Sequence, residues 1–362
     1  MTRRHCLLAP ALFAARPAEA APQTRFRIQT VRLNLRHTWT TTMSSSDHRQ
    51  VIYFLLSSGN MSGIGEGAPI VRYGESAEQA QRYAKAIAGV LDSADLMQYR
   101  KTIAAVHARL ENQWALKSAV DIAIHDWVGQ QFGQPIWRLL GLDPLATPVT
   151  SFSIGIDTPE ITKQKVREAE AYPVLKIKVG LDSDEATIDA VRSVTKKPLR
   201  VDANEGWKDK ETAVRKINWL EKQGVEFVEQ PMPAAMLDEV NWVRKRVHVP
   251  IVADEACLHP ADIPKLAPYY DGVNIKLDKC GGMLEGLRMI ETARSLGLKT
   301  MLGCMISSSV AITAAAQLSP LVDWADLDGN LLIGNDPYRG VTVESGKLIL
   351  PAAAGLGLKP AA

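Results

Sequence analysis

Short β-rich runs alternate with helical patterns after residue 148, and this alternation constrains the fold more than any other feature. Eight runs follow one another: VTSFSIG, VLKIKVG, PLRVDAN, VEFVEQP, PIVADEA, GVNIKLDK, KTMLGCM and DWADLDG. Helical patterns separate them, for example in residues 184–196 and 210–224. Eight strand–helix units are typical of a closed parallel barrel with its helices outside. We therefore predict an α/β barrel.

Charged residues recur at or just beyond the ends of these predicted strands. Five of them are spaced 24, 27, 25 and 25 residues apart, one strand–helix unit each: Lys178, Asp202, Glu229, Asp254 and Lys279. The carboxyl ends of barrel strands carry the active site in folds of this kind. Lys176 lies two residues before Lys178 and so shares its face of the strand. We expect these side chains to meet at the barrel mouth.

Three carboxylates that converge without partners repel one another, and their pKa values rise unless a cation neutralises them. Oxygen ligands without histidine or thiolate favour Mg²⁺ over zinc. The alternative is a buried ion-pair cluster without a metal, which is costly. The sequence therefore predicts a magnesium site formed by Asp202, Glu229 and Asp254.

A metal ion beside two lysines suits proton removal from a carbon next to a carboxylate, because the resulting enediolate carries two negative oxygens. Burial, the cation and the ammonium of Lys176 would favour neutral Lys178, which can then act as a base. Lys279 comes from a later strand and would face the substrate from the other side. Two bases on opposite faces of one carbon can invert its configuration.

The motifs LKIKVG, RVDANEGW, VEQP, VADEA and NIKLDKCGG resemble those of the enolase superfamily, in its muconate-lactonizing subgroup. The resemblance extends over nearly the whole chain after residue 25. It implies a modified TIM barrel, (β/α)7β, with an N-terminal α+β capping domain. It also implies one Mg²⁺ per subunit, with Mn²⁺ able to substitute.

The resemblance assigns roles residue by residue. Asp202, Glu229 and Asp254 would be the metal ligands, and Lys178 and Lys279 the acid/base pair. Lys176 would support Lys178 and the substrate carboxylate, while Asn204 and Glu255 would support the ligands from outside the metal's own shell. Lys276 competes with Lys279 for the role of base, but the motif favours Lys279 and an ion-paired, buried Lys276.

The final predicted strand bears on the reaction. Asp326 and Asp328 lie two residues apart in ADLDGN and share one face. Dipeptide epimerases of this family have such a pair, which holds the α-ammonium of the substrate. The stretch GCMISSS is also similar to theirs, and Met305 and Ser307 are expected to contact substrate. The family's sugar-acid dehydratases use a later histidine, whereas this sequence has none after His259.

The resemblance thus implies epimerisation of L-Ala-D/L-Xaa dipeptides at the α-carbon of the C-terminal residue. The best-known members act on L-Ala-D/L-Glu from cell-wall peptides and carry an arginine on a cap loop. Here that loop, residues 38–48, has no arginine, and Ser44 stands near the arginine's position. We therefore expect a neutral or apolar substrate side chain, unless Arg49 or Arg72 compensates.

Other functions remain open at this point. Within the family they are o-succinylbenzoate synthase and N-acylamino-acid racemase. From other classes they are a metal-free aldolase that uses Lys178 as a Schiff-base nucleophile, and a non-catalytic periplasmic peptide-binding protein. A net charge of +2 with no block of like charge gives no sign of a nucleic-acid surface, so we expect no nucleic-acid partner.

The 362 residues divide into four predicted segments. Residues 1–22 have arginines, an apolar stretch and small residues, which indicate a signal peptide or a disordered extension. Residues 23–120 form the cap, with a hairpin turn at 58–60, and 121–335 form the barrel. Residues 336–362 return to the cap. We expect a periplasmic or exported protein, otherwise a cytoplasmic one, forming a homo-oligomer with no membrane partner after processing.

Overall fold

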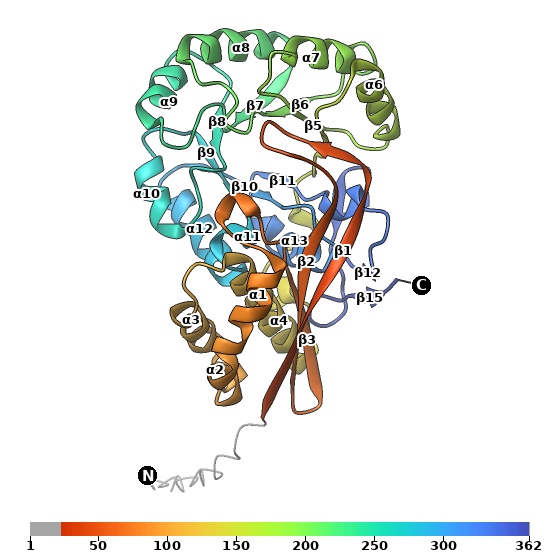
Figure 1. Ribbon diagram of the computed structural model, residues 1–362, viewed down its shortest axis with the longest axis vertical. Coiled ribbons are helices and arrows are strands. Elements are labelled where there is room, and N and C mark those ends of the chain that lie inside the picture. The colour runs from red at the N-terminus through yellow and green to blue at the C-terminus, as the bar shows by residue number, and fades with distance from the viewer. Residues whose placement is uncertain (1–22, 362) are drawn as a thin grey trace, which may run out of the picture.

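The computed structural model describes residues 23–361, so the predicted export signal lies outside the described residues. The eight predicted strands form one parallel sheet, in the order β11-β10-β9-β8-β7-β6-β5-β4 (Figure 1). A bridge between Thr150 and Ala325 joins its two edges. The predicted barrel is therefore confirmed. Its strands are β4 (Phe152–Ile154), β5 (Leu175–Lys178), β6 (Leu199–Asp202), β7 (Val225–Glu229), β8 (Ile251–Ala253), β9 (Gly272–Ile275), β10 (Lys299–Gly303) and β11 (Trp324–Asp326).

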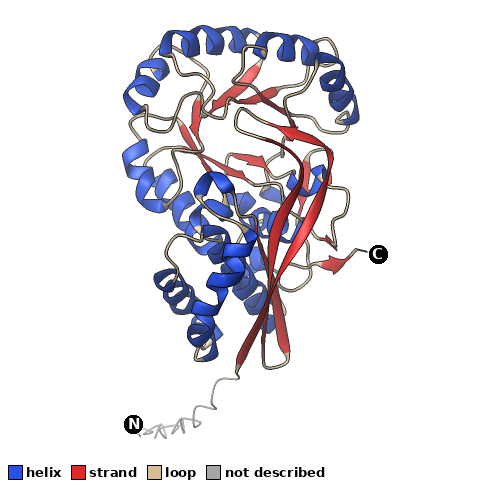
Figure 2. Cartoon of the chain, in the orientation of Figure 1, coloured by secondary structure: helices blue, strands red, loops and turns tan. Residues whose placement is uncertain are grey.

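Helices follow the first seven of these strands and cover the outside of the barrel (Figure 2). Strand β11 is followed only by a short 3₁₀ turn, η7 (Gly329–Leu332), which gives the predicted (β/α)7β pattern. Local capping explains where these helices start; in α8, for example, Asp209 accepts a hydrogen bond from Thr212 N. The helices are α6 (Pro159–Glu168), α7 (Asp184–Arg192), α8 (Lys210–Lys222), α9 (Leu237–Arg244), α10 (Ile263–Leu266), α11 (Leu277–Cys280), α12 (Met283–Ser295) and α13 (Ser309–Leu318).

The N-terminal cap combines an antiparallel sheet with helices. Its hairpin turn lies at Gly59-Asn60, as predicted. Its long helix ends at Gly133, whose φ of +62° suits glycine. The elements are β1 (Thr24–Thr40), β2 (Ser45–Ser58), β3 (Met61–Gly67), η1 (Val71–Tyr73), α1 (Ala77–Ala84), α2 (Ala88–Asp92), α3 (Tyr99–Arg109), α4 (Trp114–Phe132) and α5 (Ile136–Leu139). Helix α4 runs without a break through residue 120, where the sequence analysis ended the cap, so we describe α4 and α5 with the cap.

Strand β3 lies directly on helix α4 because three alternate positions are glycine: Gly63, Gly65 and Gly67. A Cβ at any of these positions would lie 1.9–2.1 Å from a carbonyl oxygen of α4. No side chain fits there, so the sequence pattern GIGEG is a packing requirement of the cap.

Strand β2 separates two hydrophobic cores. Val51 and Tyr53 pack in the core shared with the barrel, whereas Ile52 and Phe54 pack in the core of the cap helices. This alternation follows from the two-residue period of a strand. One face of the hairpin therefore points toward the barrel.

Acidic side chains of the cap bind the N-termini of barrel helices. Glu66 accepts hydrogen bonds from Ser308 N at 2.8 Å and Ala311 N at 2.9 Å, at the start of α13. Asp121 accepts one from Met283 N at 2.7 Å, at the start of α12. These carboxylates satisfy helix amides that would otherwise be buried without partners. The cap and the barrel therefore share buried polar contacts as well as a core.

The C-terminal segment forms two small antiparallel pairs. Strand β12 (Tyr338–Arg339) pairs with β15 (Lys359–Pro360), and β13 (Thr342–Glu344) with β14 (Lys347–Ile349). Ile136 N donates to Gly355 O, so this segment also contacts the region after α4. Cys257, Cys280 and Cys304 are free thiols. Among the residues described, no helix has the length and apolar character needed to cross a membrane.

Candidate active site

Strand register brings the predicted site residues together. Lys178 pairs with Asp202, and Asp202 pairs with Glu229, in the parallel ladders of β5, β6 and β7. Asp254 follows directly after β8. All four residues therefore lie at the carboxyl ends of adjacent strands, where a parallel barrel places its functional groups.

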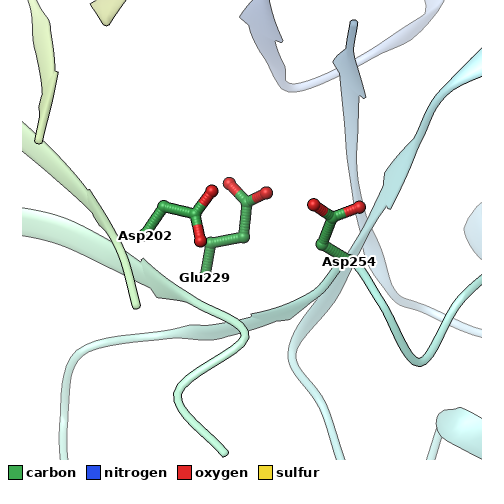
Figure 3. A group of neighbouring side chains, drawn as sticks. All are labelled: Asp202, Glu229 and Asp254. Carbon is green, nitrogen blue, oxygen red and sulfur yellow. The ribbon is translucent and has the colours of Figure 1, made fainter. Parts of the chain in front are cut away.

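Asp202, Glu229 and Asp254 form a buried carboxylate triad (Figure 3). One oxygen from each lies within 4.8 Å of the others. Burial raises the pKa of Asp202, but Lys178 and Lys176 outweigh it and bring the value to about 2. Burial and the neighbouring Asp202 raise the pKa of Glu229 to about 8. Converging hard oxygen donors, one of them a carboxyl group that loses its proton only with difficulty among its acidic neighbours, fit a divalent cation such as Mg²⁺.

Amide side chains hold the Glu229 carboxylate and the backbone of Asp254 in place. Asn274 Nδ2 donates to Glu229 Oε1 at 2.8 Å, and Gln230 Oε1 accepts from Asp254 N at 2.9 Å. Sequence reasoning missed both residues, although Gln230 directly follows a candidate ligand in VEQP and Asn274 is the first residue of NIKLDK.

The turns after two metal-ligand candidates adopt left-handed backbone conformations. Asn204 has φ +40° and Glu205 φ +64°, while Gln230 has φ +35°. Such conformations cost roughly 1–3 kcal/mol each in non-glycine residues. Asn204 N donates to Asp202 Oδ1 at 2.9 Å, and Asn204 Nδ2 donates to Glu255 Oε1 at 3.2 Å. The strained turn thus joins the two predicted supporting residues to the triad.

The Lys176 ammonium forms ion pairs with three carboxylates. Its Nζ lies 3.2 Å from Asp202, 2.7 Å from Glu229 and 2.7 Å from Asp326. Three carboxylates outweigh the effect of burial and keep the pKa of Lys176 well above its usual value. Lys176 is therefore a fixed positive charge beneath the site and not a proton acceptor.

The Lys279 ammonium donates three hydrogen bonds. Its Nζ donates to Asp254 O at 2.6 Å, Asp254 Oδ1 at 2.5 Å and Asn274 O at 3.1 Å. An ammonium has three donors, so all of those on Lys279 have acceptors. The residue lies on α11, beyond the end of β9, and is outside the set that lines the cavity described below.

Lys178 and Lys276 have one acceptor each. Lys178 Nζ lies 2.5 Å from Asp202 Oδ2, and Lys276 Nζ lies 2.7 Å from Asp254 Oδ2. Both side chains line the cavity. Lys276 is buried and ion-paired, as expected, but it also faces the space where a substrate would lie.

A cavity of about 760 Å³ lies between the cap and the barrel mouth. Of the three predicted substrate contacts, Ser44 and Met305 line this cavity, whereas the buried Ser307 does not. The wall also includes both candidate supporting residues and apolar side chains from each domain: Asn204, Glu255, Trp39, Met43, Ile70, Cys304 and Ile306.

The tip of the β1–β2 hairpin covers the barrel mouth, and Figure 1 shows this hairpin running from the cap to strands β5–β7. Ile156 N donates to Thr40 O at 3.0 Å, and Thr42 Oγ1 donates to Asn204 O at 2.8 Å. A Cβ at Gly180 would lie 2.6 Å from Thr42 Cγ2, so glycine lets the tip approach the end of β5.

The two aspartates of the last strand differ in their contacts. Asp326 accepts from Lys176 Nζ at 2.7 Å and from Ser151 Oγ at 2.7 Å. Asp328 accepts from Ser153 N at 2.6 Å. Burial and Asp326 raise the pKa of Asp328 to about 7. Both are buried and lie outside the set of cavity-lining residues, and Asp326 already has a cationic partner.

Comparisons with known proteins give matches over both domains. Residues 23–141 match the N-terminal domain of the mandelate racemase / muconate lactonizing enzyme family, and residues 161–362 match the enolase C-terminal domain-like family. An L-Ala-D/L-Glu epimerase from Bacteroides thetaiotaomicron is 40% identical over 327 residues, covering 90% of this chain and 85% of the relative. An L-Ala-D/L-amino acid epimerase from Pedosphaera parvula is 42% identical over 336 residues, covering 90% and 96%.

A solved structure has the same architecture. The dipeptide epimerase from Enterococcus faecalis, complexed with Mg and the dipeptide L-Leu-L-Tyr, is 29% identical and has a TM-score of 0.88. The match covers 94% of this chain and 100% of that one.

Proposed function

Because the chain belongs to the mandelate racemase and muconate lactonizing family of the enolase superfamily, we propose that it epimerises dipeptides. The reaction inverts the α-carbon of the C-terminal residue in substrates of the L-Ala-D/L-Xaa type. Relatives at 40% and 42% identity with epimerase activities support the proposal.

The observation that carries the mechanism is the placement of two lysines across one cavity. Lys178 ends β5 and Lys276 follows β9, four strands further round an eight-stranded barrel. They therefore stand on opposite sides of the mouth, and both line the cavity. For this reason we propose Lys276, and not Lys279, as the partner of Lys178. Lys279, which the sequence motif favoured, would orient Asp254 instead.

The two lysines exchange roles with the direction of the reaction. One neutral lysine removes the α-proton of one epimer, and the ammonium of the other returns a proton to the opposite face. A divalent cation bound by Asp202, Glu229 and Asp254 would supply positive charge to the substrate carboxylate. Lys176 adds a fixed charge nearby.

Asp328 is the proposed partner of the substrate's α-ammonium. Asp326 is held by Lys176 and Ser151, so its part is to keep this end of the site negative. Ser44 from the cap and Met305 from the end of β10 would contact the substrate directly. We further propose that Mn²⁺ can replace Mg²⁺, that the enzyme is an exported homo-oligomer, and that its substrates come from cell-wall peptides.

Hydrogen exchange in D₂O tests the proposed reaction. The purified protein with Mg²⁺ should replace the α-hydrogen of the C-terminal residue in L-Ala-L-Xaa dipeptides while the second epimer accumulates. Mass spectrometry of a dipeptide library measures both. Equal turnover of N-acetylated substrates would favour an N-acylamino-acid racemase, and turnover of a cyclohexadiene substrate without dipeptide exchange would favour o-succinylbenzoate synthase. Activity that survives complete chelation would contradict the metal-dependent mechanism.

A further inference from the structure

Four arginine and lysine side chains line the cavity, and three of them have a carboxylate partner. Lys178 contacts Asp202, Lys276 contacts Asp254, and Arg72 forms an ion pair with Glu205. Arg49 is the fourth. Within residues 23–361 it has no carboxylate partner, and its hydrogen bond goes to the backbone oxygen of His48 at 3.0 Å.

The strand period fixes which way Arg49 faces. Arg49 shares its face of β2 with Val51 and Tyr53, which pack toward the barrel. Tyr53 OH donates to Ser308 Oγ at 2.8 Å, which holds this part of the strand over the end of β10. The Arg49 side chain therefore extends from the hairpin into the space above the barrel mouth, where it lines the same cavity as Met305.

A half-buried guanidinium without a counter-charge is unfavourable by itself. Partial burial at the cavity wall lowers the pKa of Arg49. A carboxylate from a bound molecule would supply the missing partner through two parallel hydrogen bonds. In the proposed reaction the substrate's α-carboxylate lies beside the metal triad, so the partner of Arg49 would be an additional carboxylate.

We propose that Arg49 is a specificity-determining residue that binds a side-chain carboxylate, so that the preferred substrates are acidic dipeptides. The inference rests on the proposed epimerase function. It replaces the expectation drawn from the arginine-free loop 38–48, because the required cation comes from strand β2 and not from the loop. Arg72, the other arginine considered, is neutralised by Glu205.

Substrate pairs that differ in charge test this in the unaltered enzyme. We expect kcat/KM for L-Ala-L-Glu to exceed that for the isosteric L-Ala-L-Gln by at least about tenfold, the usual worth of a charge-assisted contact. Comparing kcat/KM for L-Glu-L-Ala and L-Met-L-Ala tests whether the preferred acidic side chain belongs to the first residue instead. A preference for the acidic member in either pair supports the proposal and locates the carboxylate.

The variant Arg49→Met should remove that preference, chiefly through KM, while turnover of L-Ala-L-Leu persists. The matched variant Arg72→Met, also at the cavity wall, should keep the preference. Equal or better turnover of the neutral members by the unaltered enzyme would overturn the role of Arg49 while leaving the epimerase intact. Absence of α-hydrogen exchange in every dipeptide would overturn the proposed function itself. If Arg49→Met does not fold, the kcat/KM values of the unaltered enzyme for the two substrate pairs still decide whether acidic dipeptides are preferred.

Discussion

Replacing Lys276 with alanine should give an enzyme that exchanges the α-hydrogen of only one epimer. Lys178 remains on the other side of the cavity and can still remove and return a proton there. Lys276 has a single acceptor, Asp254 Oδ2 at 2.7 Å, so its loss should act mainly on the chemistry. A general acid or base contributes about 10²- to 10⁴-fold, so epimerisation should fall by at least about 100-fold in both directions.

The variant Lys279→Met provides the contrast. It removes three hydrogen bonds, two to Asp254 and one to Asn274 O. Hydrogen bonds to charged groups contribute about 1.5–3 kcal/mol each, so the free energy of unfolding should fall by about 3 kcal/mol or more. Because Asp254 is then less well held, metal affinity should fall too. Any lost activity should affect both epimers equally.

The assay is proton NMR of the separated L,L and L,D dipeptides in D₂O, with thermal denaturation of each variant as the control for folding. The stereochemistry of exchange, and not the rate, distinguishes the two lysines. One-sided exchange in Lys279→Met, together with two-sided exchange in Lys276→Ala, would refute the assignment and restore Lys279 as the base.

Three further outcomes follow from the site and its supports. Glu229→Gln should lose both turnover and Mg²⁺ binding, the latter measured by calorimetry. Chelation should inactivate the unaltered enzyme, and added Mg²⁺ should restore its activity. If Glu229→Gln binds Mg²⁺ with unaltered affinity, Glu229 is not a ligand. Because only ionised Asp328 can hold an ammonium, and its pKa is raised to about 7, KM should rise as pH falls below 7. That dependence should vanish in Asp328→Asn, and its persistence there would point to another group. Glu66→Ala leaves helix amides such as Ser308 N without an acceptor and should lower the free energy of unfolding by about 3 kcal/mol. The control Glu78→Ala, at an exposed side chain, should change it by less than about 0.5 kcal/mol. Equal melting temperatures for these two variants would contradict the prediction.

The barrel could be predicted from sequence because its strands are short, β-rich and regularly spaced. Residues at strand ends then fall at one known face, which is why the metal triad follows from spacing alone. The same reasoning fails at NIKLDK. Strand β9 ends at Ile275 and α11 begins at Leu277, so the side-chain period changes from two residues to 3.6 between the competing lysines. Spacing cannot decide there which lysine faces the cavity.

Charge partners were the second feature that sequence could not provide. The two-residue spacing placed Asp326 and Asp328 on one face, but it could not show that Lys176 already forms an ion pair with Asp326. Likewise, Arg49 and Arg72 look equivalent in the sequence. Only the fold shows that Glu205 neutralises Arg72, because a partner 133 residues away leaves no local signal.

The cap carboxylates that bind the N-termini of barrel helices also affect how the chain folds during its synthesis. Glu66 is synthesised 242 residues before Ser308, and Asp121 162 residues before Met283. A nascent cap therefore exposes to solvent two acids whose partners in the barrel do not yet exist. Contacts so distant in sequence slow folding, since the intervening chain must close before they form. The cap can reach its final, buried state only after α13 has left the ribosome, so the last helix of the barrel completes the first domain.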